Sequence, residues 1–481
     1  MGPGAASMND AATRFDGPWL AVAADGRVLR AGAAPISGGA IDSRLVEDGV
    51  AFFALPGART DGHAFLEQAV ASGAAALVVS REIEAQRLEA LADGGRVSIV
   101  HVADTAVALR AVSAAYRDRF DPLVVGITGS LAKTSTKEQI AEVLEERFDV
   151  LRNPANWNNE IGLPMTLLRM RPEHEVAVLE MGLYTTGEIA LLASLARPSI
   201  GVVTAVRGVH LSRAGSIEAI ETGKRELVEA LPAEGWAILN ADDVRVRRMA
   251  GHTAAGVRTY GFANDADVRA SDVVSLGTAG MRFTLHVDAR TYEVSTPVLG
   301  RHGVHNALAA VAVADRAGMD IADVITGLAR PLRMPHRSQL VSAGPWRILD
   351  DSYNASPDAV LAALDLLSEL PGRHFAVLGE MLELGGSAEA EHRRVGEGAA
   401  DMTDHLVVVG EGARGIADGA IDRGLDAERV HLVADRDEAL VVLLAELREG
   451  DSVLVKASRG AALDLLVERL VLAGQSGEGA A

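Results

Sequence analysis

The stretch GITGSLAKTSTK, residues 126–137, decides the fold of the chain. It follows a short apolar run, LVVGI (123–127), and leads into a helical pattern, STKEQIAEVLEERF (135–148). A strand, a glycine-containing loop and a helix that opens with Lys-Thr favour phosphate binding, because backbone N–H groups at a helix N-terminus point at the anion. Lys133 adds positive charge, and the Thr134 hydroxyl can join a bound Mg²⁺. We therefore predict a nucleotide site formed by Gly129, Ser130, Ala132, Lys133, Thr134 and Ser135.

The loop departs from the strict phosphate-loop pattern G-x-x-x-x-G-K-[ST] at both glycines. Ala132 stands at the second glycine and Ile127 at the first. An alanine forced to positive φ would cost about 1–2 kcal/mol, whereas an alanine at the start of the helix is favoured over glycine by about 1 kcal/mol. Because the loop is otherwise intact, we expect Ala132 to be the first helical residue. The alternative reading of the pattern is a strand–helix turn that binds nothing.

Short apolar runs of strand length recur on both sides of this loop and alternate with helical patterns. They are AFFAL (51–55), AALVV (75–79), VSIVHV (97–102), EVAVLEMG (175–182), IGVVTAV (200–206), WAILNADD (236–243), RILDD (347–351), HFAVLGE (374–380), DHLVVVGE (404–411) and DSVLVKA (451–457). Alternation of this kind predicts parallel βαβ units in an α/β fold. The looser alternation from Asp265 to Val298 predicts an antiparallel insert.

Breaks in these patterns predict the domain boundaries. Asp121-Pro122 precedes the strand before the loop, and the segment 330–336 contains two prolines. We expect a flexible leader (1–16), an N-terminal domain (17–120), a central parallel-sheet domain (121–334) and a C-terminal Rossmann-like domain (335–481).

Composition excludes several classes of protein. The 481-residue chain has no cysteine, so disulfides, thiolate metal sites and cysteine nucleophiles are excluded. A net charge of −20 argues against a nucleic-acid partner. No apolar run approaches the roughly 18 residues of a membrane span, and the N-terminus lacks a signal-peptide pattern. We expect a soluble, cytoplasmic protein without membrane insertion, and we expect a monomer.

The loop, written as G-x-x-G-S-x-x-K-T-[ST]-T-K, resembles that of the Mur ligase family. Further segments resemble this family in its own order along the chain: 41–66 (IDSRLVEDGVAFFALPGARTDGHAFL), 156–170 (NWNNEIGLPMTLLRM), 178–182 (VLEMG), 301–310 (RHGVHNALAA), 350–360 (DDSYNASPDAV), 377–385 (VLGEMLELG) and 455–461 (VKASRGA). The resemblance implies three domains: an N-terminal α/β domain that binds a UDP substrate, a central P-loop-type ATPase domain and a C-terminal Rossmann-like domain.

The resemblance also implies a reaction. ATP phosphorylates a carboxylate of UDP-N-acetylmuramoyl-tripeptide to an acyl phosphate, and the amine of D-alanyl-D-alanine attacks it to form an amide in peptidoglycan precursor synthesis. Phosphoryl transfer of this kind needs charge neutralisation and alignment more than covalent help. The resemblance assigns catalytic roles to Lys133, Glu180, His210, Lys224 and Arg337.

Metal binding is expected at the ends of two strands. Glu180 ends the run VAVLE, where a carboxylate can hold Mg²⁺. The resemblance makes His210 a second ligand beside Thr134, and it makes Lys224 a lysine carbamylated by CO₂, whose new carboxylate meets the metal. Such a lysine needs a lowered pKa, from burial or from nearby cations, because only the neutral amine reacts.

The remaining site residues follow from the resemblance by position. His302, Asn306, Arg337 and Asp351 resemble nucleotide contacts, with Asn306 at the adenine, Asp351 at the ribose and Arg337 at the transferred phosphoryl group. The expected substrate contacts fall into three sets: a UDP set (Ser43, Arg44, Asp61, Gly62 and His63), two amides for the muramoyl peptide (Asn158 and Asn159), and a carboxylate-binding set (Lys456, Ser458 and Arg459).

The chain departs from the family pattern at several positions, which leaves alternatives open. Besides Ala132, these are Ala205, Ser212, Gly303 and Ala457. Ala205 and Gly303 remove amides near the nucleotide, which predicts weaker or rearranged adenine binding, and Ala457 puts the dipeptide end in question. The alternatives are a related ligase with another amine or peptide, and an inactive relative that binds nucleotide; the retained Lys133, Glu180 and Lys224 argue against the latter.

Overall fold

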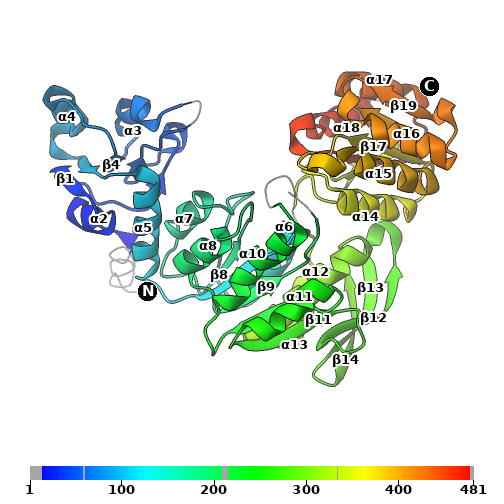
Figure 1. Cartoon of the computed structure of the whole chain (residues 1–481), viewed down its shortest axis with the longest axis horizontal. Coiled ribbons are helices and arrows are strands. Elements are labelled where there is room, and N and C mark those ends of the chain that lie inside the picture. The colour runs from blue at the N-terminus through cyan, green and yellow to red at the C-terminus, as the bar shows by residue number, and fades with distance from the viewer. Residues whose placement is uncertain (1–12, 58–59, 209–214, 333, 477–481) are drawn as a thin grey trace.

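The computed structural model describes residues 13–57, 60–208, 215–332 and 334–476. It contains a five-stranded, a nine-stranded and a six-stranded sheet, which follow one another along the chain. Figure 1 shows the N-terminal sheet and its helices (blue) and the C-terminal sheet and its helices (yellow to red) at opposite ends of the central part (cyan to green). We propose residues 17–120, 121–334 and 335–481 as the three domains, because each range holds one sheet.

The N-terminal sheet has the strand order β1-β5-β4-β3-β2, and only the β1–β5 pair is antiparallel. Its elements are α2 (Gly17–Ala23), β1 (Arg27–Arg30), β2 (Gly39–Ala40), β3 (Ala51–Phe53), α3 (Leu66–Ala71), β4 (Ala76–Val79), α4 (Ala85–Leu91), β5 (Ser98–His101) and α5 (Thr105–Arg117). Phe15, which we assigned to the leader, is instead part of this domain: it is buried and its backbone pairs with Ile36. Asp16 caps α2 by accepting from the N–H of Trp19.

The central sheet has the order β14-β13-β12-β11-β10-β9-β6-β8-β7. Its strands are β6 (Leu123–Thr128), β7 (Val150–Arg152), β8 (Val176–Glu180), β9 (Ile200–Val203), β10 (Trp236–Asn240), β11 (Gly256–Gly261), β12 (Val268–Ser275), β13 (Met281–Val287) and β14 (Arg290–Thr296). Its helices are α6 (Lys133–Leu144), α7 (Gly162–Leu167), α8 (Glu188–Ala196), α10 (Ile217–Glu229), α11 (Val244–Arg248), α12 (Gly300–Arg316) and α13 (Ile321–Leu328). The antiparallel insert is confirmed, because β12 to β14 pair antiparallel at one end of an otherwise parallel sheet.

The C-terminal sheet has the order β15-β16-β20-β17-β18-β19, parallel except for β15. Its elements are β15 (Gln339–Ala343), β16 (Trp346–Asp350), α14 (Pro357–Ser368), β17 (His374–Gly379), α15 (Ala388–Met402), β18 (His405–Val409), α16 (Arg414–Arg423), β19 (Val430–Val433), α17 (Arg436–Glu446), β20 (Ser452–Lys456) and α18 (Asp464–Ser476). Strands flanked by helices in this order are typical of a Rossmann-like domain, as expected.

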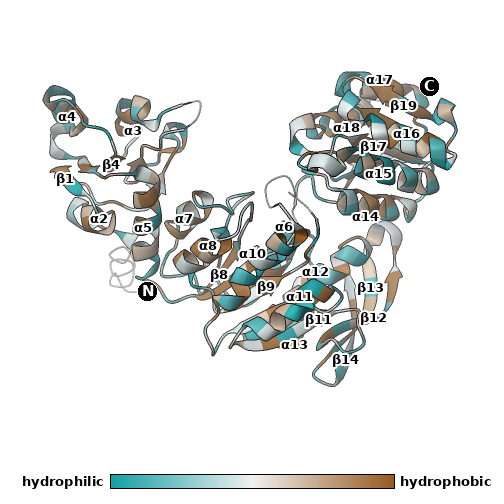
Figure 2. Cartoon of the chain, in the orientation of Figure 1, coloured by the Kyte–Doolittle hydropathy of each residue, from teal (hydrophilic) through white to brown (hydrophobic). Residues whose placement is uncertain are grey.

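The apolar runs in the sequence lie in the buried strands. Figure 2 shows that the strands are mostly hydrophobic (brown), whereas the helices that cover them carry polar residues as well. The strands β6 and β8 are almost wholly buried, which is why they read as continuous apolar runs. Within the described residues, no helix is long and apolar enough to cross a membrane.

Candidate active site

The strand that precedes the phosphate loop lies at a topological switch point. β6 pairs in parallel with β8 on one side and with β9 on the other, with Ile127 opposite Glu180 and Thr128 opposite Val203. In an open α/β sheet, ligands bind outside the carboxyl ends of the strands at such a point. The loop after β6, Glu180 at the end of β8 and the segment after β9 therefore meet at one edge of the sheet.

Ala132 has a left-handed backbone, so our expectation of a helical φ is wrong. Its φ is 61° and its ψ is 7°, and the helix begins one residue later, at Lys133. The carbonyl of Ala132 already accepts the first helical hydrogen bond, from the N–H of Thr136 at 2.8 Å. The loop thus has the turn that the missing glycine would make easily, and the alanine adopts it at a cost of about 1–2 kcal/mol.

Contacts with the segment after β9 hold the loop in this shape. The Ser130 N–H donates to the carbonyl of Ala205 at 2.7 Å, and the Thr204 hydroxyl donates to the carbonyl of Leu131 at 2.6 Å. Gly129 has a φ of 154°, and a Cβ atom there would lie 1.8 Å from the Thr204 hydroxyl oxygen. Only glycine fits at this position. Ala205 is a departure from the family pattern. It supports the loop through its backbone carbonyl, and this contact does not depend on the side chain.

Glu180 is buried at the end of β8, and each oxygen of its carboxylate has a partner. One accepts from the Thr134 hydroxyl at 2.7 Å and the other from the Asn158 side-chain amide at 2.7 Å. Asn153 holds the backbone of Glu180 from the other side: its amide oxygen accepts from the N–H at 2.9 Å, and its amide nitrogen donates to the carbonyl at 3.1 Å. The carboxylate is therefore fixed beside the first turn of α6.

Two lysines bring positive charge to this edge of the sheet. Burial lowers the pKa of Lys133, as does the nearby Arg337, while the charge of Glu180 acts in the opposite direction. Lys224, on α10, is buried, and its pKa lies well below the usual lysine value because of burial and, secondarily, the charge of Lys133. Neither ammonium forms an ion pair with another residue in the described part of the chain. A lowered pKa at Lys224 is the property that carbamylation requires.

The predicted metal ligands are only partly accounted for. Thr134 and Glu180 are in direct contact, but His210 lies outside the described residues. Among the residues that the structure places, no group of three or more His, Asp and Glu side chains converges as a metal site would.

The C-terminal domain supplies a second set of charged groups. β16 and β20 are parallel neighbours, so Asp351 and Lys456 meet at their carboxyl ends. The Lys456 ammonium donates to Asp351 at 2.5 Å and to the carbonyl of Asn354 at 2.9 Å, and the other oxygen of Asp351 accepts from the N–H of Ser338 at 3.0 Å. Lys456 keeps one N–H for a ligand.

Two arginines share one aromatic ring. The guanidinium of Arg337 lies 4.0 Å from the ring centroid of Tyr353, and that of Arg459 lies 5.0 Å from it. Both distances are within the range of cation–π attraction. Tyr353 thus holds together two cations from separate segments, the linker before β15 and the turn after β20.

His302 and Asn306 face the phosphate loop from α12. The Asn306 amide oxygen accepts from the Thr136 hydroxyl at 3.0 Å, which joins α12 to α6 and leaves its amide nitrogen for a ligand. Burial lowers the pKa of His302, although the charge of Asp351 acts in the opposite direction. A Cβ atom at Gly303 would lie 2.9 Å from a methyl group of Val298, so an asparagine does not fit there without a shift of this turn.

These residues line one cleft of about 570 Å³ between the central and C-terminal domains. It brings together most of the predicted catalytic and nucleotide residues: Ser130, Ala132, Lys133, Thr134, Ser135, Glu180, His302, Asn306, Arg337 and Asp351. Four of the predicted substrate contacts line it as well: Asn158, Lys456, Ser458 and Arg459. Gly129 and Lys224 do not line it, and Ala457 is buried behind it in the C-terminal core. The Ser458 hydroxyl accepts from the N–H of Leu382 at 2.9 Å.

The predicted UDP set lies elsewhere, in the N-terminal domain, and none of its members lines the cleft. The Ser43 hydroxyl donates to Gln68 at 2.9 Å, and Arg44, whose side chain is 80% exposed, pairs with Asp42 at 2.6 Å. Arg44 therefore has room to bind an anion, whereas Ser43 is already engaged in the fold.

The other members of the UDP set have contacts that support the fold. The Ser80 N–H donates to Nε2 of His63 at 3.0 Å, so Nδ1 carries the proton that is donated to Asp61 at 2.7 Å. The backbone N–H of His63 and this ring hydrogen bond hold the pKa of Asp61 below its usual value. A Cβ atom at Gly62 would lie 2.8 Å from the backbone nitrogen of Leu55.

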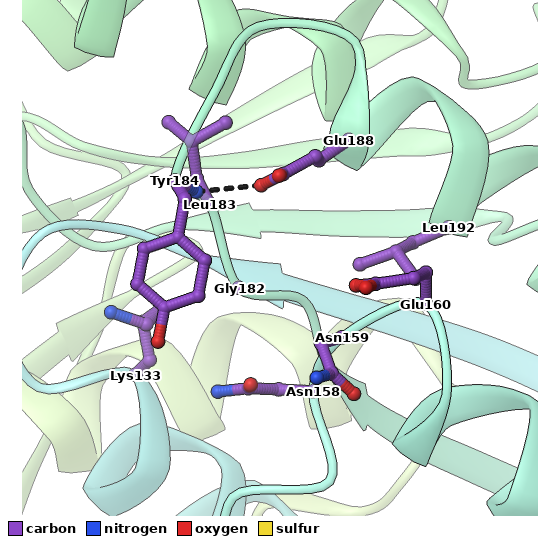
Figure 3. Close-up of a pocket in the computed structure, with 9 residues that line it drawn as sticks. All are labelled: Lys133, Asn158, Asn159, Glu160, Gly182, Leu183, Tyr184, Glu188 and Leu192. Atoms are coloured by element: carbon purple, nitrogen blue, oxygen red, sulfur yellow. Dashed lines mark hydrogen bonds between the residues drawn. The ribbon is translucent and has the colours of Figure 1, made fainter. Parts of the chain in front are cut away.

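A smaller pocket, here called the side pocket, adjoins the cleft and shares Lys133, Asn158 and Tyr184 with it. Asn159 lines it too, and its amide oxygen accepts from the N–H of Gly162 at 2.8 Å at the start of α7. Figure 3 shows the rest of the lining, which is Glu160, Gly182, Leu183, Glu188 and Leu192. A Cβ atom at Gly182 would lie 2.9 Å from the Asn158 amide oxygen, so this close approach requires glycine.

Sequence reasoning missed two aromatic residues of the site, Tyr184 and Tyr353. Tyr353 stands within the motif DDSYNASP, two residues after the predicted Asp351. An aromatic residue in a polar turn after a strand was the signal that could have found it. Tyr184 follows Glu180 by four residues and carried no comparable signal.

Comparisons with known proteins agree with this architecture. Three family models match: the Mur ligase family catalytic domain over residues 35–145, the Mur ligase middle domain over 127–314 and the Mur ligase glutamate ligase domain over 336–459. The UDP-N-acetylmuramoyl-tripeptide--D-alanyl-D-alanine ligase of Mycobacterium tuberculosis is 41% identical over 471 residues, covering 89% of this chain and 91% of that protein.

Solved structures give the same result. A crystal structure of MurF from Acinetobacter baumannii superposes with a TM-score of 0.85 at 29% identity, covering 95% of this chain and 99% of that one. The MurF ligase of Thermotoga maritima in complex with ADP has a TM-score of 0.79 at 27% identity, with 92% and 98% covered. The three matched domains, in the family's order, together with the 41% identity to the M. tuberculosis protein, establish that this chain belongs to the Mur ligase family.

Proposed function

We propose that this protein joins D-alanyl-D-alanine to UDP-N-acetylmuramoyl-tripeptide at the expense of ATP, in peptidoglycan precursor synthesis. The observation that carries the proposal is the cleft, where the phosphate loop, Glu180, Arg337 and Lys456 face one another from two domains. The similar proteins from Mycobacterium tuberculosis, Bacillus subtilis and Escherichia coli all bear the name of this D-alanyl-D-alanine ligase.

ATP is the nucleotide that fits the cleft. The T. maritima MurF ligase was solved with ADP. Here the β- and γ-phosphates would lie at the N-terminus of α6, against the N–H groups of the loop and Lys133. Asn306 has an amide nitrogen free for the base, and Asp351 has lone pairs free for the ribose beyond those that Ser338 and Lys456 use.

Mg²⁺ fits the oxygen atoms beside the phosphates. The Thr134 hydroxyl and the Glu180 carboxylate are in contact at 2.7 Å, and this pair of oxygen donors is the kind that Mg²⁺ prefers. Mg²⁺ usually keeps several water ligands and binds through one or two carboxylates and substrate phosphates, so a small protein ligand set is sufficient. Bound there by Thr134 and Glu180, with His210 as a further proposed ligand, the ion would neutralise phosphate charge.

Lys224 is proposed to carry a carbamate derived from CO₂. Its ammonium is buried without an ion-pair partner in the described part of the chain, and its pKa is lowered well below the usual value. Carbamylation would exchange a poorly solvated cation for an anion beside the cationic Lys133, which removes their mutual repulsion.

The reaction requires two substitutions in sequence. A carboxylate oxygen of the tripeptide attacks the γ-phosphorus of ATP, the bond to the β-phosphate oxygen breaks, and ADP leaves. The amine of the dipeptide then attacks the acyl carbon, inorganic phosphate leaves, and the amine loses a proton as the amide forms. Lys133 and Arg337 bind the transferred phosphoryl group in this scheme, and such preorganised cations stabilise the developing charge.

The two other substrate sets approach from the outer domains. Arg44 and its neighbours are proposed to bind the UDP group, and Lys456, Ser458 and Arg459 a carboxylate of the dipeptide or peptide. Arg459 is exposed, and Lys456 has one N–H left, so both can accept an anion. Multidomain ligases bring such sets together by domain closure.

The experiment is phosphate release from ATP with the full-length protein, Mg²⁺ and bicarbonate, omitting each substrate in turn. We expect release only with ATP, UDP-N-acetylmuramoyl-tripeptide and D-alanyl-D-alanine together, and its loss in Lys133→Ala. Other amines in place of D-alanyl-D-alanine test for a related ligase: release with one of them and none with D-alanyl-D-alanine would refute the proposal. Nucleotide binding without turnover of any pair would indicate the inactive relative.

A further inference from the structure

The side pocket adjoins the place where the last residue of the acceptor peptide would lie. Under the proposed function, the carboxylate of that residue reacts with the γ-phosphate and so lies beside Lys133. Lys133, Asn158 and Tyr184 line both the cleft and the side pocket, so the pocket begins where the reacting carboxylate would be. The side chain on the same carbon atom would then extend into the pocket.

The far side of the pocket combines an apolar side chain with a carboxylate. Figure 3 shows Glu160 and Leu192 across the pocket from Lys133 and Tyr184. Leu192 suits methylene groups, and Glu160 beside it suits a cation. An aliphatic chain that ends in an ammonium group has this pattern.

Glu160 has no competing partner. Within the described residues, its carboxylate accepts no hydrogen bond and forms no ion pair. The other carboxylate of the pocket, Glu188, is engaged by the backbone N–H groups of Tyr184 at 2.6 Å and Thr185 at 3.1 Å. Glu160 is therefore the one acidic group among the described residues of this pocket that is free for a ligand.

We propose that Glu160 determines specificity at the third residue of the acceptor peptide by binding its side-chain ammonium group. The inference rests on the proposed function and deepens it. Lysine and diaminopimelate both carry such a group, and one solved A. baumannii relative is a 2,6-diaminopimelate--D-alanyl-D-alanyl ligase by name. The ammonium of the substrate, once bound, lies against Glu160 and away from the positively charged Lys133.

The test is a double-mutant cycle between the protein and its substrate. KM and kcat are measured for wild type and Glu160→Gln with three tripeptides, which end in lysine, diaminopimelate or norleucine. Norleucine has nearly the shape of lysine without the ammonium group. In wild type we expect norleucine to raise KM for the tripeptide roughly 10-fold over lysine, equivalent to about 1.4 kcal/mol. In Glu160→Gln we expect this difference to fall below about 2-fold.

Two controls separate this effect from general damage. Glu234→Gln removes an exposed carboxylate from a turn outside both pockets and should leave the 10-fold difference unchanged. Glu160→Asp keeps the charge and should retain part of the preference. The peptides that end in lysine and diaminopimelate share the side-chain ammonium group, but only diaminopimelate has a second carboxylate. If Glu160 binds the ammonium group, Glu160→Gln should raise KM alike for both peptides.

An equal norleucine penalty in wild type and Glu160→Gln would overturn the assignment of Glu160 while the ligase activity stands. Wild-type protein that turns over none of the three peptides, in the presence of every other substrate, would instead overturn the proposed function. The two failures are thus distinguishable from one data set.

Discussion

Replacing Ala132 with glycine should stabilise the central domain, although alanine-to-glycine changes in helices usually destabilise proteins. The reason is the left-handed backbone of Ala132, with φ at 61°. An alanine in this conformation is strained by about 1–2 kcal/mol. Glycine at the same position is not strained, because it has no Cβ atom.

The expected gain is smaller than the strain, since glycine also makes the unfolded chain more flexible. That effect opposes folding by about 0.4–1 kcal/mol. The mid-range values of the two effects leave a net stabilisation of about 0.8 kcal/mol, which corresponds to roughly 2–3 °C in Tm for a domain of this size. Nucleotide affinity should change by only a few-fold, because the loop already has its left-handed turn before any ligand binds.

The assay is thermal unfolding followed with and without ATP, so that the transition shifted by nucleotide identifies the central domain. Two substitutions in the same domain calibrate it. Ala289, in the turn between β13 and β14, is exposed and also has a φ of 61°, so Ala289→Gly should raise Tm by a similar amount. Ala322 is exposed on the right-handed helix α13, and Ala322→Gly should lower Tm.

One result would refute this reasoning. If Ala132→Gly lowers Tm as Ala322→Gly does, while Ala289→Gly raises it, then Ala132 is a helical residue in solution and the loop has another shape. A gain in Tm together with a large change in ATP affinity would instead mean that the methyl group contacts the phosphates.

Three further predictions concern residues in or near the cleft. Gly129→Ala should abolish nucleotide binding, because its methyl carbon would lie 1.8 Å from the Thr204 hydroxyl oxygen; isothermal titration with ADP measures this, and affinity within 10-fold of wild type would contradict it. Lys224→Met should remove activity in bicarbonate without loss of stability, because the lowered pKa of Lys224 makes its charged form costly to bury. Lys224 binds its proton more tightly in the unfolded chain than in the folded one. The unfolding free energy of wild type should therefore rise relative to that of Lys224→Met as pH increases toward about 10.5. A difference between the two proteins that does not change with pH in denaturant titrations would argue against a lowered pKa. Tyr353→Leu should weaken binding of a non-hydrolysable ATP analogue about 10-fold and leave ADP binding nearly unchanged, because the ring positions Arg337 for the γ-phosphate. Tyr353→Phe keeps the ring and should bind the analogue as wild type does. Equal losses for both nucleotides would instead indicate that the ring stacks on the base.

Much of the architecture follows from the sequence because the strands that build the site are fully buried. Such strands read as apolar runs, and a residue that ends one, such as Glu180, must lie at the carboxyl edge of a parallel sheet. The edge strands were missed: β1, β7, β15 and β19 are short or half-exposed, so their residues show no continuous apolar pattern.

The conformation of Ala132 was not predictable from its neighbours in sequence. Its φ is set by contacts of Ser130 and Leu131 with residues 204 and 205, about seventy positions further along the chain, and local propensity alone favours a helical alanine. The contact of Arg337 and Arg459 with Tyr353 likewise depends on β16 and β20 being sheet neighbours, although about a hundred residues of sequence separate them. Local sequence patterns therefore predict which strands and loops carry the site residues, whereas contacts between distant segments determine the conformations and neighbours of those residues.

The charges of the cleft explain how an acidic protein can bind anionic substrates. Lys456 is already neutralised by Asp351, and Glu180 is satisfied by Thr134 and Asn158. Lys133, by contrast, forms no ion pair with any residue that the structure describes, and burial and Arg337 disfavour its charge more than Glu180 favours it. A phosphate group beside Lys133 and Arg337 would relieve that repulsion, whereas a protein carboxylate there would compete with it. The chain as a whole has a net charge of −20, but the positive charge at the loop has no ion-pair partner among the described residues and is therefore available to an anionic ligand.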